Sequence, residues 1–152
     1  MDLHKIVQEI QYVLAPAIMI SSASLLLLGF QNKFSSLTNR FRILNQEKRS
    51  LEAKPSRSES EEKRFANLKE QVDGLMQRAT HVKNAIILTY GAIVSFIATS
   101  VLLFLNIYTP LHSIALTIAC FLIGLLLIFA SSALMMIEVA LAFKIVSLEH
   151  RL

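Results

Sequence analysis

Residues 84–137 run NAIILTYGAIVSFIATSVLLFLNIYTPLHSIALTIACFLIGLLLIFASSALMMI, and these 54 residues contain no Lys, Arg, Asp or Glu. A membrane-spanning helix needs only about 20 predominantly apolar residues, so the stretch is long enough for two spans. It is divided near Thr109 and Pro110, because Thr caps helix N-termini well and Pro suits the first helical position. We therefore expect one span at residues 85–105 and another at residues 110–134.

Another apolar segment, residues 10–30, lies near the N-terminus and carries no charge. As a helix it is about 32 Å long, enough to cross a hydrocarbon core of roughly 30 Å. Ala15-Pro16-Ala17 has the spacing of a signal-peptide cleavage site, but the strongest apolar run, residues 25–28, follows it. A cleaved signal has the opposite order, so we expect this segment to be retained as the first of three spans.

The composition agrees with a membrane protein and offers no sign of catalysis. Of 152 residues, 54% are hydrophobic and 17% charged, whereas about a quarter are charged in soluble domains. The single Cys120 excludes a disulfide within the chain, and the four His residues are scattered. No nucleophile elbow, HExxH, P-loop or pair of carboxylates within a span is present. We expect no enzyme activity, no cofactor and no metal.

The Lys and Arg residues predict the orientation in the membrane. Twelve of the fifteen lie in residues 31–84, and the turn at residues 106–113 has none. The positive-inside rule places residues 31–84 and 144–152 in the cytoplasm, with the N-terminus and that turn outside.

The basic residues do not predict a nucleic-acid site. Seven acidic residues are mixed with them in residues 31–84, and the remaining excess is explained by the topology. Solvated helix faces are one interpretation of these charges, and contact with anionic lipid of the inner leaflet is the other. The residues expected near that lipid are Lys33, Arg40, Arg42, Arg78 and Lys83.

Residues 34–83 have the pattern of an antiparallel helical hairpin between the first and second spans. Pro55 ends the first helix, and Ser58 to Glu61 form a capping box that begins the next. We expect Leu44 and Leu75 to lie in the buried seam between the two helices. Apolar residues at heptad spacing are Phe34, Leu37, Phe41, Leu44 and Leu51, then Phe65, Leu68, Val72, Leu75, Ala79, Val82 and Ile86.

The third helix is predicted to extend beyond the bilayer. Residues 110–144 would span about 50 Å as a helix, and residues 135–150 form the expected cytoplasmic extension. An exposed apolar stripe favours a partner, so we expect this extension to complete a three-helix bundle with the hairpin. The stripe comprises Leu134, Ile137, Leu141, Ile145 and Leu148.

Small and weakly polar residues recur along each span. Such stripes allow close helix packing, and the alternative is that their hydroxyls line a pore. Pro16 is a candidate kink in the first helix. The candidate packing or pore-facing residues are Ser21, Ser24, Gly91, Ser95, Thr99, Thr117, Gly124 and Ser131.

Glu138 is the one Asp, Glu, Lys or Arg between Lys83 and Lys144. It follows residue 110 by about 42 Å of helix, so we expect it near the inner interface. A carboxylate on a packing face near lipid is costly unless paired, and the alternative is a solvated interfacial Glu. The expected basic partners are Arg40, Arg42 and Lys83, with Asn39 and Asn84 as supporting donors. The pair would act as a structural clamp or as an ion-binding gate.

Several sequence pieces resemble a bacterial membrane family, domain of unknown function 2721. They are LAPAIMIS at residues 14–21, LLLLGFQNKF at 25–34 and NRFRILN at 39–45, with Arg78-Ala79, Lys83-Asn84-Ala85, Ile137-Glu138-Val139 and Ala142. The resemblance covers nearly the whole chain. It implies a bacterial integral membrane protein and no known activity.

The sequence thus predicts an all-α integral membrane protein with a single domain, three transmembrane helices and a cytoplasmic antiparallel helical hairpin. We expect a non-enzymatic homo-oligomer in the bacterial inner membrane whose hairpin mediates self-association or partner docking. The alternative is a small homo-oligomeric ion channel or permeation subunit, because three spans are few for a transporter made of one chain.

Overall fold

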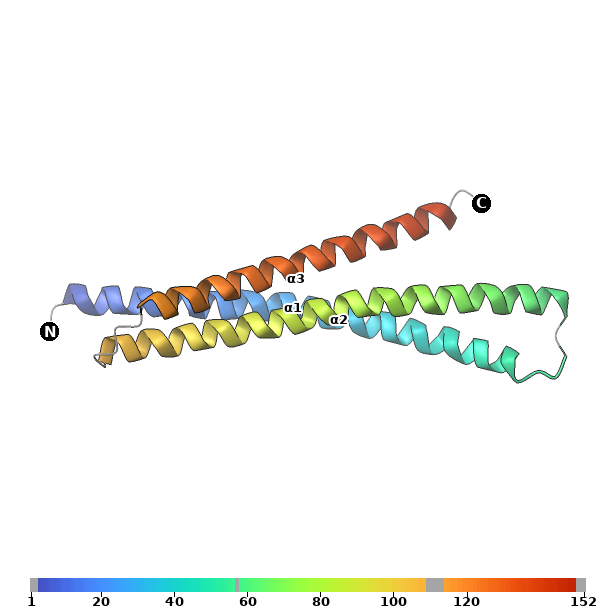
Figure 1. Cartoon of the computed structure of the whole chain (residues 1–152), viewed down its shortest axis with the longest axis horizontal. Coiled ribbons are helices and arrows are strands. Elements are labelled where there is room, and N and C mark those ends of the chain that lie inside the picture. Colours follow the sequence, from blue (N-terminus) through green and yellow to red (C-terminus); the bar gives the residue numbers. More distant parts are fainter. Residues whose placement is uncertain (1–2, 57, 109–113, 150–152) are drawn as a thin grey trace.

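The computed structural model describes residues 3–56, 58–108 and 114–149, and three long helices account for nearly all of them (Figure 1). They are α1 (Leu3–Glu52), α2 (Glu59–Tyr108) and α3 (Ile114–Glu149). Successive helices run in opposite directions, so the chain starts and ends at opposite ends of the long axis (Figure 1). The all-α prediction is confirmed.

Each helix contains a segment long and apolar enough to cross a membrane. These segments are Ile10–Glu52, Glu59–Ile107 and Ile114–Phe143. With 50 residues, α1 and α2 are each about 75 Å long, well beyond a hydrocarbon core of roughly 30 Å. Each therefore continues without a break from its apolar segment into one arm of the hairpin.

The hairpin turn forms where the sequence predicts it. α1 ends at Glu52 and α2 begins at Glu59. The backbone N–H of Ser58 donates to Oε2 of Glu61 over 2.9 Å, and the backbone N–H of Glu61 donates to Oγ of Ser58 over 3.4 Å. These reciprocal bonds are the predicted capping box, which satisfies two donors that the helix cannot.

A buried cluster joins α1 and α2 at the end of the hairpin that adjoins the apolar segments. Leu37, Leu75 and Val82 form its centre. Leu44 is half-buried and packs on its edge, so the predicted seam is confirmed, with Leu75 deeper in it than Leu44. The other residues packed against it are Phe34, Phe41, Ile86 and Met135.

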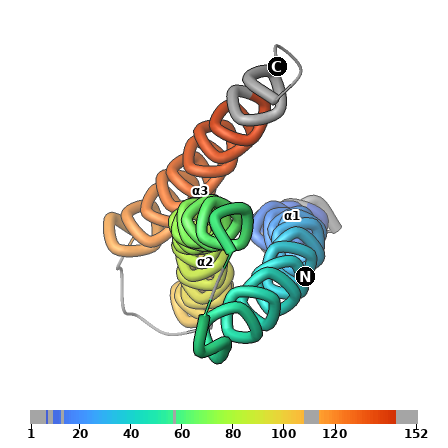
Figure 2. Tube along the Cα trace, turned by 90° about the vertical axis from the view of Figure 1, so that its right-hand side faces the viewer, coloured from blue at the N-terminus to red at the C-terminus, as the bar shows by residue number. Residues whose placement is uncertain are grey.

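The predicted three-helix bundle forms only in part: Met135 on α3 packs against the cluster that joins α1 and α2. α2 packs against both neighbours, whereas α1 and α3 barely touch. α3 is inclined to α2 and moves away from it towards the C-terminus (Figures 1 and 2). Ile137 is half exposed, because it lies on another side of α3 than its buried neighbour Glu138, and Phe143 is 73% exposed. The side chains of Ile145 and Leu148 lie outside the described part of the chain.

The divergence has a geometric cause. Two helices that cross at an angle approach closely only near the crossing point, and their separation grows on either side. The small side chains of α3 that permit close approach are Gly124 and Ser131, which lie in its middle. An apolar stripe beyond that point cannot by itself bring the helix back to the hairpin.

Candidate functional site

The buried face of α3 is built from small and polar residues. Thr117, Gly124, Ser131 and Glu138 are all buried, and they recur every seven residues. Seven residues make nearly two turns, so these four share one side of the helix, which packs against α2. Glu138 is the last member of this series and has 0% exposure.

Two basic residues from the other helices reach Glu138. On α2, Arg78 donates from Nε over 3.0 Å and from Nη2 over 2.9 Å, both to Oε1 of Glu138. On α1, Lys33 forms an ion pair with Oε2. The Arg78 and Lys33 side chains are 18% and 30% exposed, so the cluster is shielded from solvent on most sides. This triad of Lys33, Arg78 and Glu138 links all three helices.

The predicted partners of Glu138 are wrong. All five of them are exposed: Arg40, Arg42, Lys83, Asn39 and Asn84. No described carboxylate forms an ion pair with Arg40, Arg42 or Lys83.

The reason is helix phase and axial position. At 100° per residue, Lys83 lies about 140° around α2 from Arg78, and Arg42 lies about 180° around α1 from Lys33. Arg40 shares the side of Lys33 but lies about 10 Å further along α1.

The pairing of Glu138 is energetically demanding. Removing a carboxylate from water costs several kcal/mol, and charges that are well placed and hydrogen-bonded offset that cost. Here one carboxylate faces two cations, so the triad carries a net positive charge. The triad can hold the three helices together as a structural clamp. Alternatively, because of its net positive charge, it can bind an ion and act as a gate.

Hydroxyl groups connect α2 to α3 through the rest of the contact. Thr89 and Ser131 are hydrogen-bonded over 2.9 Å, and both are buried. Ser95 donates to the backbone carbonyl of Cys120 over 2.6 Å, and the amide of Asn106 donates to Thr117 over 2.9 Å. These groups satisfy one another within a single chain.

The candidate stripe residues of α2 and α3 therefore lie at a helix contact. Thr99 is buried and donates to the Ser95 carbonyl over 2.9 Å. Gly91 is half-buried, and a Cβ added there would lie 3.4 Å from Leu127.

The candidate residues of α1 are placed differently. Ser21 and Ser24 are exposed and donate to the carbonyls of Ala17 and Ile20 in their own helix, over 3.2 and 2.8 Å. Pro16 is buried, and α1 continues on both sides of it.

Sequence reasoning missed Lys33 and Arg78 as partners of Glu138. A signal for Arg78 was present: Leu75, Arg78, Val82, Ala85 and Thr89 have 3-4 spacing and share one face of α2. The heptad count placed Ala79 in that seam instead. For Lys33 the sequence has no comparable signal. Among the described residues, no group of three His, Cys, Asp or Glu side chains could hold a metal ion.

A comparison with protein families matches residues 13–148 to the model described as protein of unknown function (DUF2721). The chain belongs to this family. The matched region contains nearly all of the apolar segment of α1, the apolar segments of α2 and α3, and all three residues of the triad, so the DUF2721 region includes the whole candidate site. Neither the curated proteins nor the solved structures contain a match to the chain.

Proposed function

We propose that the chain is a non-enzymatic, oligomeric bacterial membrane protein whose hairpin mediates self-association or partner docking in the cytoplasm. The divergence of α3 carries this proposal. α3 moves away from α2 towards its C-terminus and barely touches α1, so one chain does not complete the helical bundle that its apolar pattern favours (Figure 1). A second chain can cover the surfaces that remain.

The orientation follows from charge. The helices cross the inner membrane three times with the N-terminus outside and the C-terminus in the cytoplasm, as the Lys and Arg asymmetry favours. The opposite positions of the two chain ends along the molecule agree with an odd number of crossings (Figure 1). Residues 31–84 then stand in the cytoplasm.

Exposed apolar side chains on that side support association. Ile43 on α1 is 67% exposed and lies in a charged segment. Phe143 follows Ile114 by about 43 Å of helix, which exceeds the hydrocarbon core even for an inclined helix of moderate tilt. Exposed apolar surface in water favours contact with another protein. The neighbouring exposed residues of α3 are Met136, Ile137 and Val139.

The subunit count of the purified protein in detergent, measured by light scattering, tests the proposal. We expect more than one chain per particle, and we expect Phe143→Ala to shift the count towards the monomer. Phe129→Ala is a matched control, because Phe129 is 74% exposed on the same helix but lies within the span expected at residues 110–134, whereas Phe143 lies in the expected extension. A monomeric wild-type protein at all concentrations would contradict self-association.

One observation favours the channel alternative. The hydroxyls of Ser21 and Ser24 lie exposed on the apolar segment of α1 and contact no other described helix through a hydrogen bond. An oligomer that places α1 around a shared axis would bring these hydroxyls together, as in polar pore linings. Ion flux into liposomes that carry the protein tests this. Flux that Ser24→Leu blocks would favour the channel, and absence of flux would remove it.

A further inference from the structure

The hairpin has an uneven distribution of charge along its length. Its base, residues 31–46 and 74–84, contains five basic residues and no Asp or Glu. Its tip, residues 47–73, contains seven basic and seven acidic residues. The positive-inside rule favours Lys and Arg near the ends of the spans, and the lack of Asp and Glu at the base leaves most of that positive charge uncompensated.

At the tip, opposite charges pair with each other. Lys54 pairs with Glu61, Lys63 with Glu59, and Arg64 with Glu47. These pairs are exposed and contribute little stability, but they neutralise the tip.

At the base, only two of the five basic residues have an acidic partner. Glu138 reaches across from α3 and engages Lys33 and Arg78. Arg40, Arg42 and Lys83 are exposed, and none of them forms an ion pair with a described residue. Three positively charged side chains without a described acidic partner therefore lie at the end of the hairpin next to the apolar spans.

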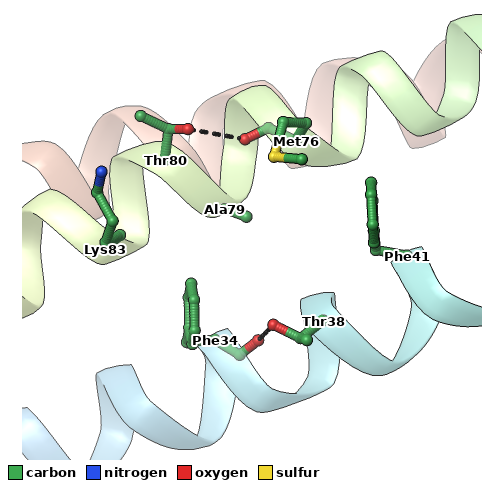
Figure 3. Close-up of a pocket in the computed structure, with 7 residues that line it drawn as sticks. All are labelled: Phe34, Thr38, Phe41, Met76, Ala79, Thr80 and Lys83. Carbon is green, nitrogen blue, oxygen red and sulfur yellow. Dashed lines mark hydrogen bonds between the residues drawn. The ribbon is translucent and has the colours of Figure 1, made fainter.

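Open space lies beside one of these three charges. A groove of about 300 Å³ separates α1 from α2, with Phe34 and Phe41 on one wall and Met76 and Ala79 on the other (Figure 3). Lys83 lines the end of the groove that lies nearer to the span. No side chain fills this space, and the Lys83 side chain stands at its edge (Figure 3).

The groove holds no competing charge. Its two hydroxyls, Thr38 and Thr80, donate to the carbonyls of Phe34 and Met76 in their own helices over 2.9 and 3.0 Å. Their oxygens retain lone pairs that can accept a hydrogen bond from a bound headgroup. Lys83 is the only charged residue that lines the groove.

We propose that Lys83, at the edge of the groove, binds the phosphate of an anionic phospholipid in the inner leaflet, and that Arg40 and Arg42, on different sides of α1, add longer-range attraction. The site rests on the cytoplasmic placement of the hairpin. Lys83 then lies about 3 Å beyond the start of the α2 span, at the depth of the phosphates. Arg40 and Arg42 are exposed on the same side of the membrane, where each basic residue adds to the attraction of anionic lipid.

Native mass spectrometry of the full chain, titrated with phosphatidylglycerol or phosphatidylcholine, tests the site. We expect phosphatidylglycerol to bind more tightly, and we expect Lys83→Gln to weaken it by about fivefold. The triple variant Arg40→Gln, Arg42→Gln, Lys83→Gln should bring both lipids to similar affinity. Raised salt should reduce the preference in the wild type.

A control removes the same charge elsewhere. The triple variant Arg49→Gln, Lys63→Gln, Lys69→Gln changes three exposed residues of the tip and should keep the preference for phosphatidylglycerol. Equal loss in both triple variants would overturn the site in favour of net charge alone. Equal binding of both lipids to the wild type would overturn it too, and would leave the groove to a protein partner.

The same spectra separate this inference from the proposed function. They report the number of chains in each particle as well as the bound lipids. A monomer that still prefers phosphatidylglycerol would contradict self-association and support the lipid site. An oligomer without that preference would do the reverse. Circular dichroism confirms that each variant is helical, and the single Lys83→Gln variant suffices if the triple variant does not fold.

Discussion

The ring of Phe96 on α2 lies directly over Gly124 on α3. A Cβ added at Gly124 would lie 2.6 Å from Cε1 and 2.9 Å from Cδ1 of that ring, closer than van der Waals contact allows. Phe96 is fully buried and also packs against Phe121, with 5.7 Å between ring centroids. The absence of a side chain at Gly124 therefore allows α2 and α3 to approach at this point.

We expect Gly124→Ala to destabilise the protein by about 1–3 kcal/mol, because the added methyl group forces the buried Phe96 ring or the helices apart. Unfolding of the purified protein in mixed micelles measures the change. Gly29→Ala is the matched control, since Gly29 lies in a helix with nothing within 4 Å of an added Cβ. This control should be neutral or stabilise by up to about 1 kcal/mol. Equal effects at both glycines would refute the close approach.

Glu138→Gln should destabilise the protein by about 3 kcal/mol, because it leaves Arg78 and Lys33 without their carboxylate in a shielded site. Arg78→Gln should cost a similar amount. Lys33→Gln should cost about 1 kcal/mol or less, since Lys33 is the most exposed member and loses one contact.

Ion flux measured on the same Glu138→Gln variant distinguishes a clamp from a gate. Lost stability with unchanged flux indicates a clamp, whereas altered ion selectivity indicates a gate. A variant with unchanged stability and unchanged flux would show that the triad serves neither role.

Leu75→Ala should destabilise the hairpin by about 2–5 kcal/mol, because Leu75 is buried in the seam and its removal leaves a cavity. Leu44→Ala should cost less, since Leu44 is only half-buried. Met76→Ala provides the control, because Met76 is exposed beside Leu75. Thermal unfolding measures the stabilities of the three variants, and we expect Leu75→Ala to be the least stable. A Met76 variant as unstable as the Leu75 variant would mean that the seam is assigned to the wrong face of α2.

A cysteine placed at Ser58 should be protected from an impermeant thiol reagent in intact cells and become reactive when the membrane is opened. A cysteine at Thr109 should react from outside in both cases. The reason is the excess of Lys and Arg between the first two spans. Labelling of the Ser58 variant from the outside would reverse the proposed orientation. Replacing Cys120 by Ala first removes the native thiol.

The pKa of Glu61 should lie below 4.5, because its carboxylate accepts a hydrogen bond from Lys54 and another from the Ser58 backbone N–H. A lowered pKa stabilises the folded turn at pH values above the pKa that Glu61 has in the unfolded chain. This stabilisation is lost as the pH falls through the pKa of the folded state. Carboxyl NMR titration of the full chain measures it. Lys54→Gln should move the midpoint towards 4.5, whereas Lys63→Gln should not, since Lys63 pairs with Glu59.

Features that depend on local sequence were predictable. The hairpin turn follows from Pro55 and the Ser58–Glu61 capping box, whose bonds involve residues within one helical turn. The seam at Leu75 follows from spacing along a single helix. The number of helices follows from the length of uncharged sequence, because the run of 54 residues exceeds one span and residues 10–30 supply another.

Features that depend on how helices are rotated and shifted against each other required the tertiary structure. Sequence identified Glu138 as a residue that needs a basic partner, but many basic residues lie near enough along the chain. Arg78 pairs with Glu138 and Lys83 does not, because they lie on different sides of α2. Lys33 pairs with it and Arg40 does not, because Arg40 lies further along α1. The divergence of α3 likewise depends on the close approach of Phe96 and Gly124. Sequence spacing determines which residues share a face of one helix, and packing between helices decides which residue on the next helix that face meets.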